Sequence, residues 1–338
     1  MAATIRDIKE MTGLSLATIS KYLNGGNVLP ENRIKIEMAI KELRYEVNEI
    51  ARGLVTNKTR TVGVIVYSIE SLFNGTLLRY IGASLRKQGY GLLICDSCND
   101  KKIEANNVKF LLNKKVDGMI VVPVAQTANF LKPAKDAGVP VVLMDRSFQD
   151  AKFDCVKIDN RKAAFNAVNL LLQNNHERIA IISSGKMEYT GYERYKGYID
   201  AMLHADVKVP DEYIKTGIHS IEYGHDSMEQ LLELKDRPTA VFMTNYEITL
   251  GAIMAMNEAN VRCPEDISML GFDDLVLSQV VKPRMYMVAQ PMKGMSENAV
   301  QLLLNRIENK VDEMPIELIM SAKILEGNSI MSIFPKGI

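Results

Sequence analysis

Residues 62–66 read Val-Gly-Val-Ile-Val, a short apolar run that polar and turn-forming residues enclose. Runs of the same kind recur along the chain at 91–94, 118–122, 139–144, 179–182, 240–243 and 267–270. Such runs are typical of strands that are buried on both faces. Because they alternate with helical patterns of about 12 residues, the sequence predicts right-handed β-α-β units and parallel sheets. The runs fall into two series, before and after residue 175, which predicts two doubly wound α/β lobes.

Residues 1–45 have a different pattern, which predicts a small all-α head. Thr4 begins a capping-box pattern, Ser15 is expected to cap a second helix, and Pro30 begins a third. A turn of three residues with a central glycine joins the first two helices. This spacing predicts a helix-turn-helix, whose second helix enters the major groove of DNA. Residues 46–60 are expected to form a polar bridge to the lobes.

The bulk composition is that of an ordinary globular protein without a membrane segment. The chain has 338 residues, of which 47% are hydrophobic and 24% charged, and no apolar stretch reaches about 18 residues. The N-terminus lacks the apolar core of a signal peptide, so a cytoplasmic location without membrane contact is expected. The formal net charge is zero, but residues 1–60 hold ten Lys and Arg against seven Asp and Glu. This mild excess permits a DNA-binding head.

Cys95 and Cys98 form a C-x-x-C pair, which raises the hypotheses of a redox site or a zinc site. The other two cysteines, Cys155 and Cys263, supply no second pair at metal-site spacing. Cys95 also ends an apolar run. We therefore expect buried or incidental thiols here, and neither a metal nor a cofactor.

The second helix of the head carries residues that can read bases. Ile19 and Leu23 share one face and are expected to point inward. An exposed Leu16 would be unusual on a solvated helix, but leucine and alanine side chains contact the methyl group of thymine. Lys21 can reach guanine or a phosphate. The alternative remains that the three helices form a scaffold whose polar face only meets water.

Several segments of the head have a specific pattern. They are Thr4-Ile5-Arg6-Asp7-Ile8, Gly13-Leu14-Ser15, Ala17-Thr18-Ile19-Ser20-Lys21-Tyr22-Leu23-Asn24, Ile40-Lys41-Glu42-Leu43-Arg44-Tyr45-Glu46-Val47-Asn48 and Ala51-Arg52-Gly53-Leu54. These segments resemble the lactose-repressor (LacI/GalR) family of transcription regulators. The resemblance implies contacts to operator DNA from Thr4, Ser15, Leu16, Ala17, Thr18, Ser20, Lys21, Asn24, Asn48, Ala51 and Leu54. Lys21 stands where the family usually has an arginine, which removes bidentate geometry from that contact.

The resemblance also implies a hinge helix after the head, which becomes ordered on the operator. Leu54 matches the leucine that wedges into the minor groove and kinks the DNA, and Ala51 matches the small residue one turn before it. An apolar wedge opens a base step, and the resulting bend brings further contacts. Plain packing of Leu54 within a linker remains the alternative.

The same resemblance continues almost to the C-terminus. Its landmarks are Val116-Asp117-Gly118-Met119-Ile120, Val141-Val142-Leu143-Met144-Asp145-Arg146, Val156-Lys157-Ile158-Asp159-Asn160, Arg194-Tyr195-Lys196-Gly197-Tyr198 and Pro264-Glu265-Asp266-Ile267-Ser268-Met269-Leu270-Gly271-Phe272-Asp273-Asp274. The implied fold is the periplasmic-binding-protein type (type I), with two lobes joined by crossovers near 159–161, 287–290 and 319–322. The implied divisions are a helix-turn-helix domain at 1–46, a hinge helix and linker at 47–60, a first lobe at 61–159 with 290–320, and a second lobe at 160–288 with 321–338.

Ligands of such sheets bind in the crevice at the carboxyl ends of the strands. Strand ends, nearby aromatic residues and the resemblance give an expected effector site of Tyr67, Ser68, Phe73, Asp145, Arg146, Asn160, Tyr189, Arg194, His219, Asn245 and Asp273. Carboxylates and amides bind paired hydroxyls, and aromatic rings cover an apolar sugar face, so we expect a sugar or sugar derivative. Three alternatives stay open: Asp273 only caps a helix, Arg146 only pairs with an acid, and Phe73 belongs to the core or a dimer interface.

Three departures from the family's pattern leave the identity of the effector open. Tyr246 follows Asn245 where the family commonly has aspartate, and His219 replaces an often aromatic residue. The segment Glu326-Gly327-Asn328-Ser329 stands in place of a late Arg-x-Ser.

Together these patterns predict a sequence-specific DNA-binding transcription regulator, by default a repressor, whose operator affinity depends on an effector. Two heads are needed to read a palindromic site on double-stranded DNA, so a homodimer is expected, with interface helices at Leu72–Gln88 and Leu250–Asn260. No catalytic motif occurs and the four histidines are scattered, so no enzymatic activity is expected. The alternatives are a sugar-processing enzyme and a sugar-binding protein whose head contacts protein.

Overall fold

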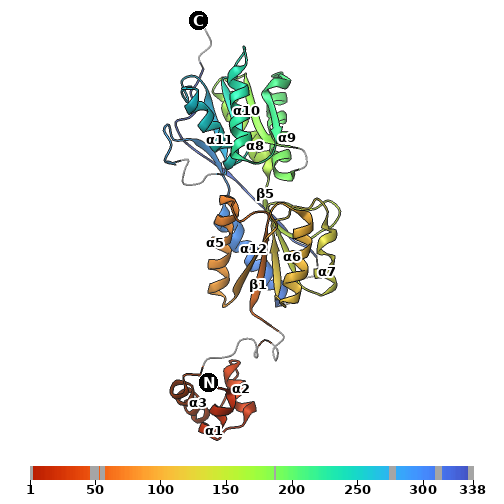
Figure 1. Cartoon of the computed structure of the whole chain (residues 1–338), viewed down its shortest axis with the longest axis vertical. Coiled ribbons are helices and arrows are strands. Elements are labelled where there is room, and N and C mark those ends of the chain that lie inside the picture. Colours follow the sequence, from red (N-terminus) through yellow and green to blue (C-terminus); the bar gives the residue numbers. More distant parts are fainter. Residues whose placement is uncertain are drawn as a thin grey trace.

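The computed structural model describes residues 3–45, 53, 58–185, 188–273, 279–308 and 314–333. Two α/β lobes lie one above the other in Figure 1, and the three helices at the N-terminal end lie apart from both lobes. This arrangement confirms the predicted fold class, an all-α head followed by two doubly wound lobes. In the part of the chain that is described, no helix has the length and apolar character needed to span a membrane.

The head is a trio of short helices around a very small core. The helices are α1 (Ile5–Thr12), α2 (Leu16–Leu23) and α3 (Pro30–Leu43). Ile8, Ile19 and Ile36, one from each helix, are fully buried and form the centre of this core. Both predicted caps are present, a capping box at Thr4 and a side-chain cap at Ser15. Local sequence therefore fixes where the first two helices begin.

The first lobe is a six-stranded parallel sheet covered by helices. Its strand order is β11-β5-β4-β3-β1-β2. The strands are β1 (Thr61–Val66), β2 (Gly91–Asp96), β3 (Gly118–Val121), β4 (Val141–Met144), β5 (Asp154–Ile158) and β11 (Glu317–Met320). The helices are α5 (Leu72–Lys87), α6 (Lys101–Asn113), α7 (Lys132–Asp136) and α12 (Met292–Ile307), with a 3-10 turn η1 (Ala128–Leu131). Val62, Val64 and Ile65 on β1 are fully buried, as expected for a strand covered on both faces.

The second lobe repeats this topology with the strand order β12-β10-β9-β8-β6-β7. Its strands are β6 (Ile179–Ser184), β7 (Ile214–Gly217), β8 (Ala240–Met243), β9 (Ser268–Phe272), β10 (Tyr286–Ala289) and β12 (Lys323–Leu325). Its helices are α8 (Asn160–Gln173), α9 (Tyr189–His204), α10 (Ile221–Glu233) and α11 (Tyr246–Glu258), with a 3-10 turn η2 (Asp211–Tyr213). β12 runs antiparallel to β10, whereas the other neighbouring strands are parallel.

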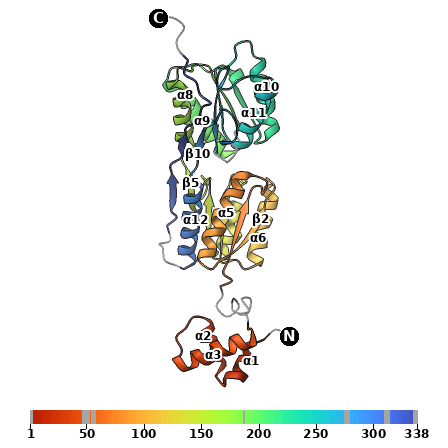
Figure 2. The same ribbon diagram turned by 90° about the vertical axis from the view of Figure 1, so that its left-hand side faces the viewer.

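The chain passes between the two sheets at three places, which lie close together in Figure 2. It leaves the first sheet after β5, returns after β10 to form α12, and leaves again between β11 and β12. The connecting residues are 159, 290–291 and 321–322. Because α12 packs against α5 and against β3, β4 and β5, the chain near the C-terminus completes the first lobe.

Five observed strands, β5, β7, β10, β11 and β12, are not among the apolar runs that the sequence analysis used. β11 and β12 lie at the edges of their sheets, where Glu317 and Lys323 are exposed. β5 begins with Asp154 and has Lys157 between its apolar residues, so its sequence does not form a continuous apolar run. A search for apolar runs detects strands that are buried on both faces and misses strands of this kind.

Candidate functional site

A cavity of about 970 Å³ lies between the two lobes, at the carboxyl ends of their strands. Its first-lobe wall comes from segments that follow β1, β2, β3 and β4, and its second-lobe wall from segments that follow β6, β7, β8 and β9. Parallel strands end at the same edge of their sheet, so residues far apart in the sequence meet here.

Nine of the eleven residues predicted for the effector site line this cavity. They are Tyr67, Ser68, Phe73, Asp145, Arg146, Arg194, His219, Asn245 and Asp273. Asn160 and Tyr189 are not among the lining residues. Asn160 is buried and accepts a hydrogen bond from Arg194, whereas the ring of Tyr189, at the start of α9, lies 6.0 Å from Lys157 Nζ. The sequence analysis also missed several lining residues with polar side chains, among them Ser71, Glu188, Thr190 and Glu247.

Arg194 on α9 is the best-anchored cation of the site. Its Nε donates to Asn160 Oδ1 at 2.8 Å, and its Nη1 donates to the carbonyl oxygen of Thr244 at 2.5 Å and to Asp273 Oδ2 at 3.1 Å. The guanidinium carbon lies 3.6 Å from the centre of the Phe272 ring. Arg194 is only 3% exposed, so these contacts hold its charge in one position at the cavity wall.

The two buried aspartates of the cavity differ in how well they are partnered. Asp273 accepts hydrogen bonds from Arg194 and, at 2.6 Å, from Gln290 Nε2. Asp145 has no hydrogen-bond partner at Oδ1, and its ion pair with Arg146 is long at 3.9 Å. Burial raises the pKa of Asp145 to about 6, although Arg146 and Arg194 act in the opposite direction. Asp145 therefore offers an acceptor to a ligand that can donate a hydrogen bond.

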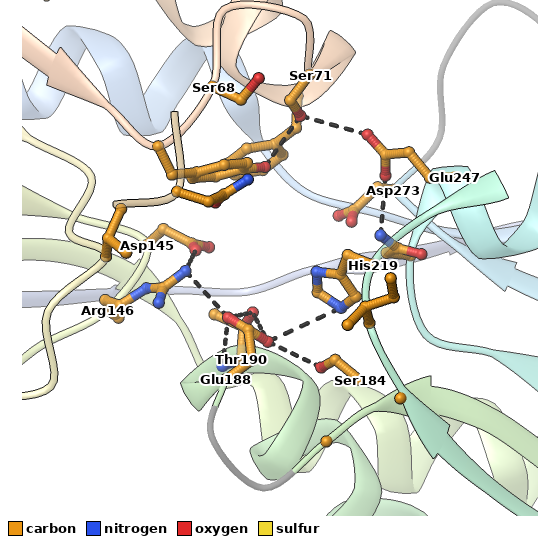
Figure 3. Close-up of a pocket in the computed structure, with 18 of the residues that line it drawn as sticks. Ser68, Ser71, Asp145, Arg146, Ser184, Glu188, Thr190, His219, Glu247 and Asp273 are labelled. Carbon is orange, nitrogen blue, oxygen red and sulfur yellow. Dashed lines mark hydrogen bonds and ion pairs between the residues drawn. The ribbon is translucent and has the colours of Figure 1, made fainter. Parts of the chain in front are cut away.

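Arg146 pairs with an acid that the sequence analysis did not foresee. Its Nη2 lies 3.0 Å from Glu188 Oε1, across the cavity in the other lobe (Figure 3). His219 Nε2 lies 3.8 Å from Glu188 Oε2. Burial lowers the pKa of His219 below its ordinary value, against the attraction of Glu188. The ring of His219 is therefore neutral near pH 7 and can exchange hydrogen bonds with an uncharged ligand.

Aromatic rings line the first-lobe side of the cavity, and Ser71 on that side reaches a second glutamate, Glu247 of the second lobe. The Tyr67 hydroxyl and Ser71 Oγ are 2.9 Å apart, and Ser71 Oγ also donates to Glu247 Oε1 at 3.4 Å. Burial raises the pKa of Tyr67 and of Glu247. Phe73 is 7% exposed and belongs both to the core of the first lobe and to the cavity wall.

The exposed face of α2 carries several of the residues that were predicted to contact bases. Leu16 is 40% exposed, and Ala17, Lys21 and Asn24 are also exposed. The remaining predicted contacts in the head are Thr4 and Ser15, both exposed, and Thr18 and Ser20, both half-buried. Asn48, Ala51 and Leu54 lie outside the described residues. An apolar side chain that stays exposed between polar neighbours fits contact with base edges.

The cysteines do not belong to a cluster of possible metal ligands in the described residues. All four are free, with Cys95 buried and Cys98 exposed. In the described residues, the group of side chains spaced like metal ligands is His225, Glu229 and Glu258, which contains no cysteine.

Comparison with known proteins identifies the family. A family profile described as "Periplasmic binding proteins and sugar binding domain of LacI family" matches residues 59–324. Catabolite control protein A of Priestia megaterium is 33% identical over 94% of this chain and 97% of its own. The HTH-type transcriptional repressor PurR of Pasteurella multocida (strain Pm70) is 31% identical over 93% of this chain and 95% of its own.

Solved structures agree with this match. A complex of the transcriptional regulator CelR with cellobiose has a TM-score of 0.73 and 25% sequence identity, and the alignment covers 97% of this chain and 99% of CelR. The lac repressor dimer, bound to operator and the anti-inducer ONPF, has the same fold, with a TM-score of 0.88 at 20% identity over 98% of this chain and all of that one. The chain therefore belongs to the LacI family of transcription regulators.

Proposed function

We propose that this protein is a cytoplasmic repressor that binds operator DNA as a homodimer, and that an effector between its lobes controls this binding. The observation that carries the proposal is the presence of two features in one chain, an exposed face on α2 that carries Leu16 between polar side chains and a polar cavity between two lobes. The names of the relatives support it, because PurR is a repressor and CelR was solved with cellobiose.

In this proposal, α2 enters the major groove. Leu16 and Ala17 meet thymine methyl groups, and the exposed ammonium group of Lys21 reaches a guanine or a phosphate. Leu54, Asn48 and Ala51 lie outside the described residues, and their proposed role rests on the resemblance, in which an apolar side chain opens a base step in the minor groove.

The effector in this proposal is a sugar or a related polyol. Asp145 offers buried acceptor oxygens, and Arg194 offers donors whose position Asp273 and Asn160 maintain. Phe73 adds an apolar surface to the wall. A polyol presents adjacent donors and acceptors together with an apolar face, which suits this mixture of groups. We assign the cavity a binding role without a chemical step.

Two helix faces are proposed to form the dimer, that of α5 and that of α11. Leu72 at the start of α5 is 51% exposed, and Met254 on α11 is 42% exposed. Met256, which lies within the predicted interface range Leu250–Asn260, is 2% exposed and belongs to the core of the second lobe. It therefore cannot contribute to a partner surface without a change in the fold.

The DNA-binding part is tested by selecting sequences from a random pool with the full-length protein, followed by fluorescence anisotropy at several salt concentrations. We expect a palindromic site and a linear fall of log affinity with log salt. Lys21→Ala should reduce the salt slope by about one if Lys21 contacts a phosphate. Lys132→Ala is the matched control, because Lys132 pairs with Asp136 on the first lobe and should leave the slope unchanged. Binding without any sequence preference would refute a repressor role.

The effector part is tested by thermal unfolding against a panel of sugars, followed by operator titration with each hit. A ligand at about 100 times its dissociation constant stabilises the folded protein by about 2.7 kcal/mol. The same ligand should change the affinity of the protein for the operator. A ligand can control DNA binding only if it binds the operator-binding conformation and the other conformation of the protein with different affinities. A ligand that binds the cavity and leaves operator affinity unchanged would refute the control.

A further inference from the structure

An ion pair crosses the cavity and joins the two lobes. Arg146 follows β4 in the first lobe, and Glu188 stands directly before α9 in the second. Their Nη2 and Oε1 atoms are 3.0 Å apart, and the side chains are 11% and 23% exposed (Figure 3). Another polar contact between the lobes, from Ser71 to Glu247, is longer at 3.4 Å. The ion pair is thus the shorter of these two links across the cavity.

Glu188 is also held firmly by its own lobe. Its Oε2 accepts hydrogen bonds from the backbone N–H of Gly191 at 2.6 Å and from Ser184 Oγ at 3.0 Å, and its Oε1 accepts from Thr190 Oγ1 at 2.8 Å. Gly191 and Thr190 belong to the first turn of α9, a helix of 16 residues whose N-terminus favours an anion. Burial alone would raise the pKa of Glu188, but Arg146 and these hydrogen bonds outweigh burial and keep the pKa below its ordinary value.

The groups around this carboxylate form a complete anion site. A guanidinium, backbone N–H groups at a helix N-terminus and hydroxyl groups all converge on it, and proteins use the same donors to bind free phosphate and carboxylate ligands. In this protein the anion is part of the chain. We infer that Glu188 is a built-in anionic ligand, which ties the two lobes through Arg146 and excludes anionic effectors. The cavity then takes an uncharged polyol or one that carries an amino group. This inference rests on the proposed function, which makes the cavity the effector site.

The other charges of the cavity wall favour the same class of ligand. The described lining residues include six carboxylates against three cations, which are Lys101, Arg146 and Arg194. Two of these cations already pair with carboxylates, Arg146 with Glu188 and Arg194 with Asp273. An anionic ligand would therefore meet a wall of net negative charge. Asp145, in contrast, is 4% exposed with Oδ1 unpartnered, and a hydroxyl or ammonium group can donate to it.

Replacement of Glu188 by alanine should turn this corner of the cavity into a binding site for a free anion. The probe is inorganic phosphate, titrated into full-length Glu188→Ala by calorimetry and by thermal unfolding, with sodium chloride at matched ionic strength as the reference. We expect phosphate to bind the variant at least about tenfold more tightly than the wild type, a factor that corresponds to about 1.4 kcal/mol. Phosphate should also raise the unfolding temperature of the variant.

Glu193→Ala is the matched control for the loss of a negative charge. Glu193 lies on the same helix, α9, and pairs with Lys196 of its own lobe. Its replacement should therefore leave phosphate binding at the wild-type level. A phosphate response of Glu193→Ala equal to that of Glu188→Ala would show that net charge alone matters, and would overturn the inference.

Two further variants keep the test decisive if Glu188→Ala folds poorly. Arg146→Met retains Glu188 at the start of α9 but removes the link between the lobes. We expect this variant to have a larger radius of gyration in X-ray scattering than the wild type, and not to bind phosphate. The double variant that combines Arg146→Met with Glu188→Ala should lose the gain in phosphate affinity that Glu188→Ala alone shows. An unchanged radius for Arg146→Met, or wild-type protein that binds phosphate as tightly as Glu188→Ala, would overturn the inference.

A ligand panel separates the failure of this inference from the failure of the proposed function. The panel contains each neutral sugar together with its phosphate ester and its amino derivative, and the wild type should bind only uncharged or amino members. A sugar phosphate that binds the wild type, with affinity lost in Arg146→Met, would overturn the inference and leave the effector site standing. No binding of any member, with phosphate still bound by Glu188→Ala, would count against the effector site and support the built-in anion.

Discussion

Replacement of Arg194 by methionine should destabilise the second lobe far more than the loss of an arginine from the surface. Methionine retains an unbranched apolar chain in the same space, so the main change is electrostatic. The variant leaves Asp273, which is 9% exposed, without its cation. It also removes the hydrogen bonds that two buried oxygens, Asn160 Oδ1 and the carbonyl oxygen of Thr244, accept from Arg194.

The size of the effect follows from the burial of these groups. Removing one partner of a buried ion pair typically destabilises a protein by about 3–5 kcal/mol, because the other charge stays buried without compensation. The comparison is Arg161, which pairs with Asp200 at the surface of the same lobe, where the side chains are 49% and 34% exposed. An exposed pair of this kind contributes about 0–1 kcal/mol. We therefore expect Arg194→Met to exceed Arg161→Met by at least about 2 kcal/mol.

Urea unfolding followed by far-ultraviolet circular dichroism is the appropriate measurement, since the chain contains no tryptophan. The midpoint of Arg194→Met should fall well below those of the wild type and Arg161→Met. Adding Asp273→Asn to Arg194→Met should recover part of the loss, because the uncompensated charge disappears. If the free energy of unfolding of Arg194→Met lay within about 1 kcal/mol of that of Arg161→Met, the view that Arg194 compensates a buried charge would be refuted.

Three further predictions concern single positions. The pKa of Asp145 lies at about 6 in the folded protein and near 3.8 in the unfolded chain, so the folded state binds the proton more tightly and loses stability as the pH rises from about 4 to 6. Asp145→Asn should remove this pH dependence and be up to about 3 kcal/mol more stable than the wild type at pH 7 in thermal unfolding. An unchanged profile of stability against pH would contradict this prediction. Gly197→Ala should destabilise the protein by about 1–3 kcal/mol, because the new Cβ would lie 2.2 Å from the carbonyl oxygen of Arg161, whereas Gly75→Ala meets nothing within 4 Å and should stabilise it by about 0.4–1 kcal/mol in the same assay. Ser15→Ala removes the cap of α2 and should lower the stability of this helix by about 1 kcal/mol. Amide hydrogen exchange in α2 should become faster by the corresponding factor, with exchange in the lobes as the internal control.

The sequence predicts the buried strands and the part of the site at the strand ends, because both follow from local patterns. Asp145 comes directly after an apolar run, Asn245 and Asp273 follow such runs within three residues, and all three line the cavity. The rule that parallel strands end at one edge brings Asn245 and Asp273 together in the second lobe, and the resemblance to two-lobed binding proteins places Asp145 opposite them. The exposed side of α2 was also predictable from local pattern, because the buried Ile19 fixes which side of this short helix points inward.

Glu188 and Glu247 were not predicted, because their roles depend on the opposite lobe. Glu188 belongs to the loop before α9, and its partner Arg146 lies in the other lobe. Such a contact depends on how the two lobes face each other, which no local periodicity encodes. Asn160 was misplaced for a different reason. It does follow a crossover after a strand end, but it accepts its hydrogen bond from Arg194 Nε and does not line the cavity.

The repeated topology of the lobes places two aspartates in equivalent positions with different partners. Asp145 follows β4 and Asp273 follows β9, and these strands hold the same place in their two sheets. Both residues have positive φ, 72° and 67°, a conformation that aspartate adopts more readily than most residues. Arg194 approaches Asp273 to 3.1 Å, whereas Arg146 lies 3.9 Å from Asp145. The first lobe therefore leaves its aspartate open for a ligand.

We attribute this difference to Glu188, because Arg146 Nη2 lies 3.0 Å from Glu188 Oε1 and 3.9 Å from Asp145 Oδ2. Burial is the main cause of the raised pKa of Asp145, and the charge of Glu188 adds to it. In Glu188→Ala, Arg146 is free to approach Asp145 and one repelling charge is lost, so the pKa of Asp145 should fall from about 6 towards 3.8. Carboxyl ¹³C NMR of the variant across this pH range measures the shift. If the pKa stayed at about 6, burial alone would set it, and Glu188 and Asp145 would not compete for Arg146.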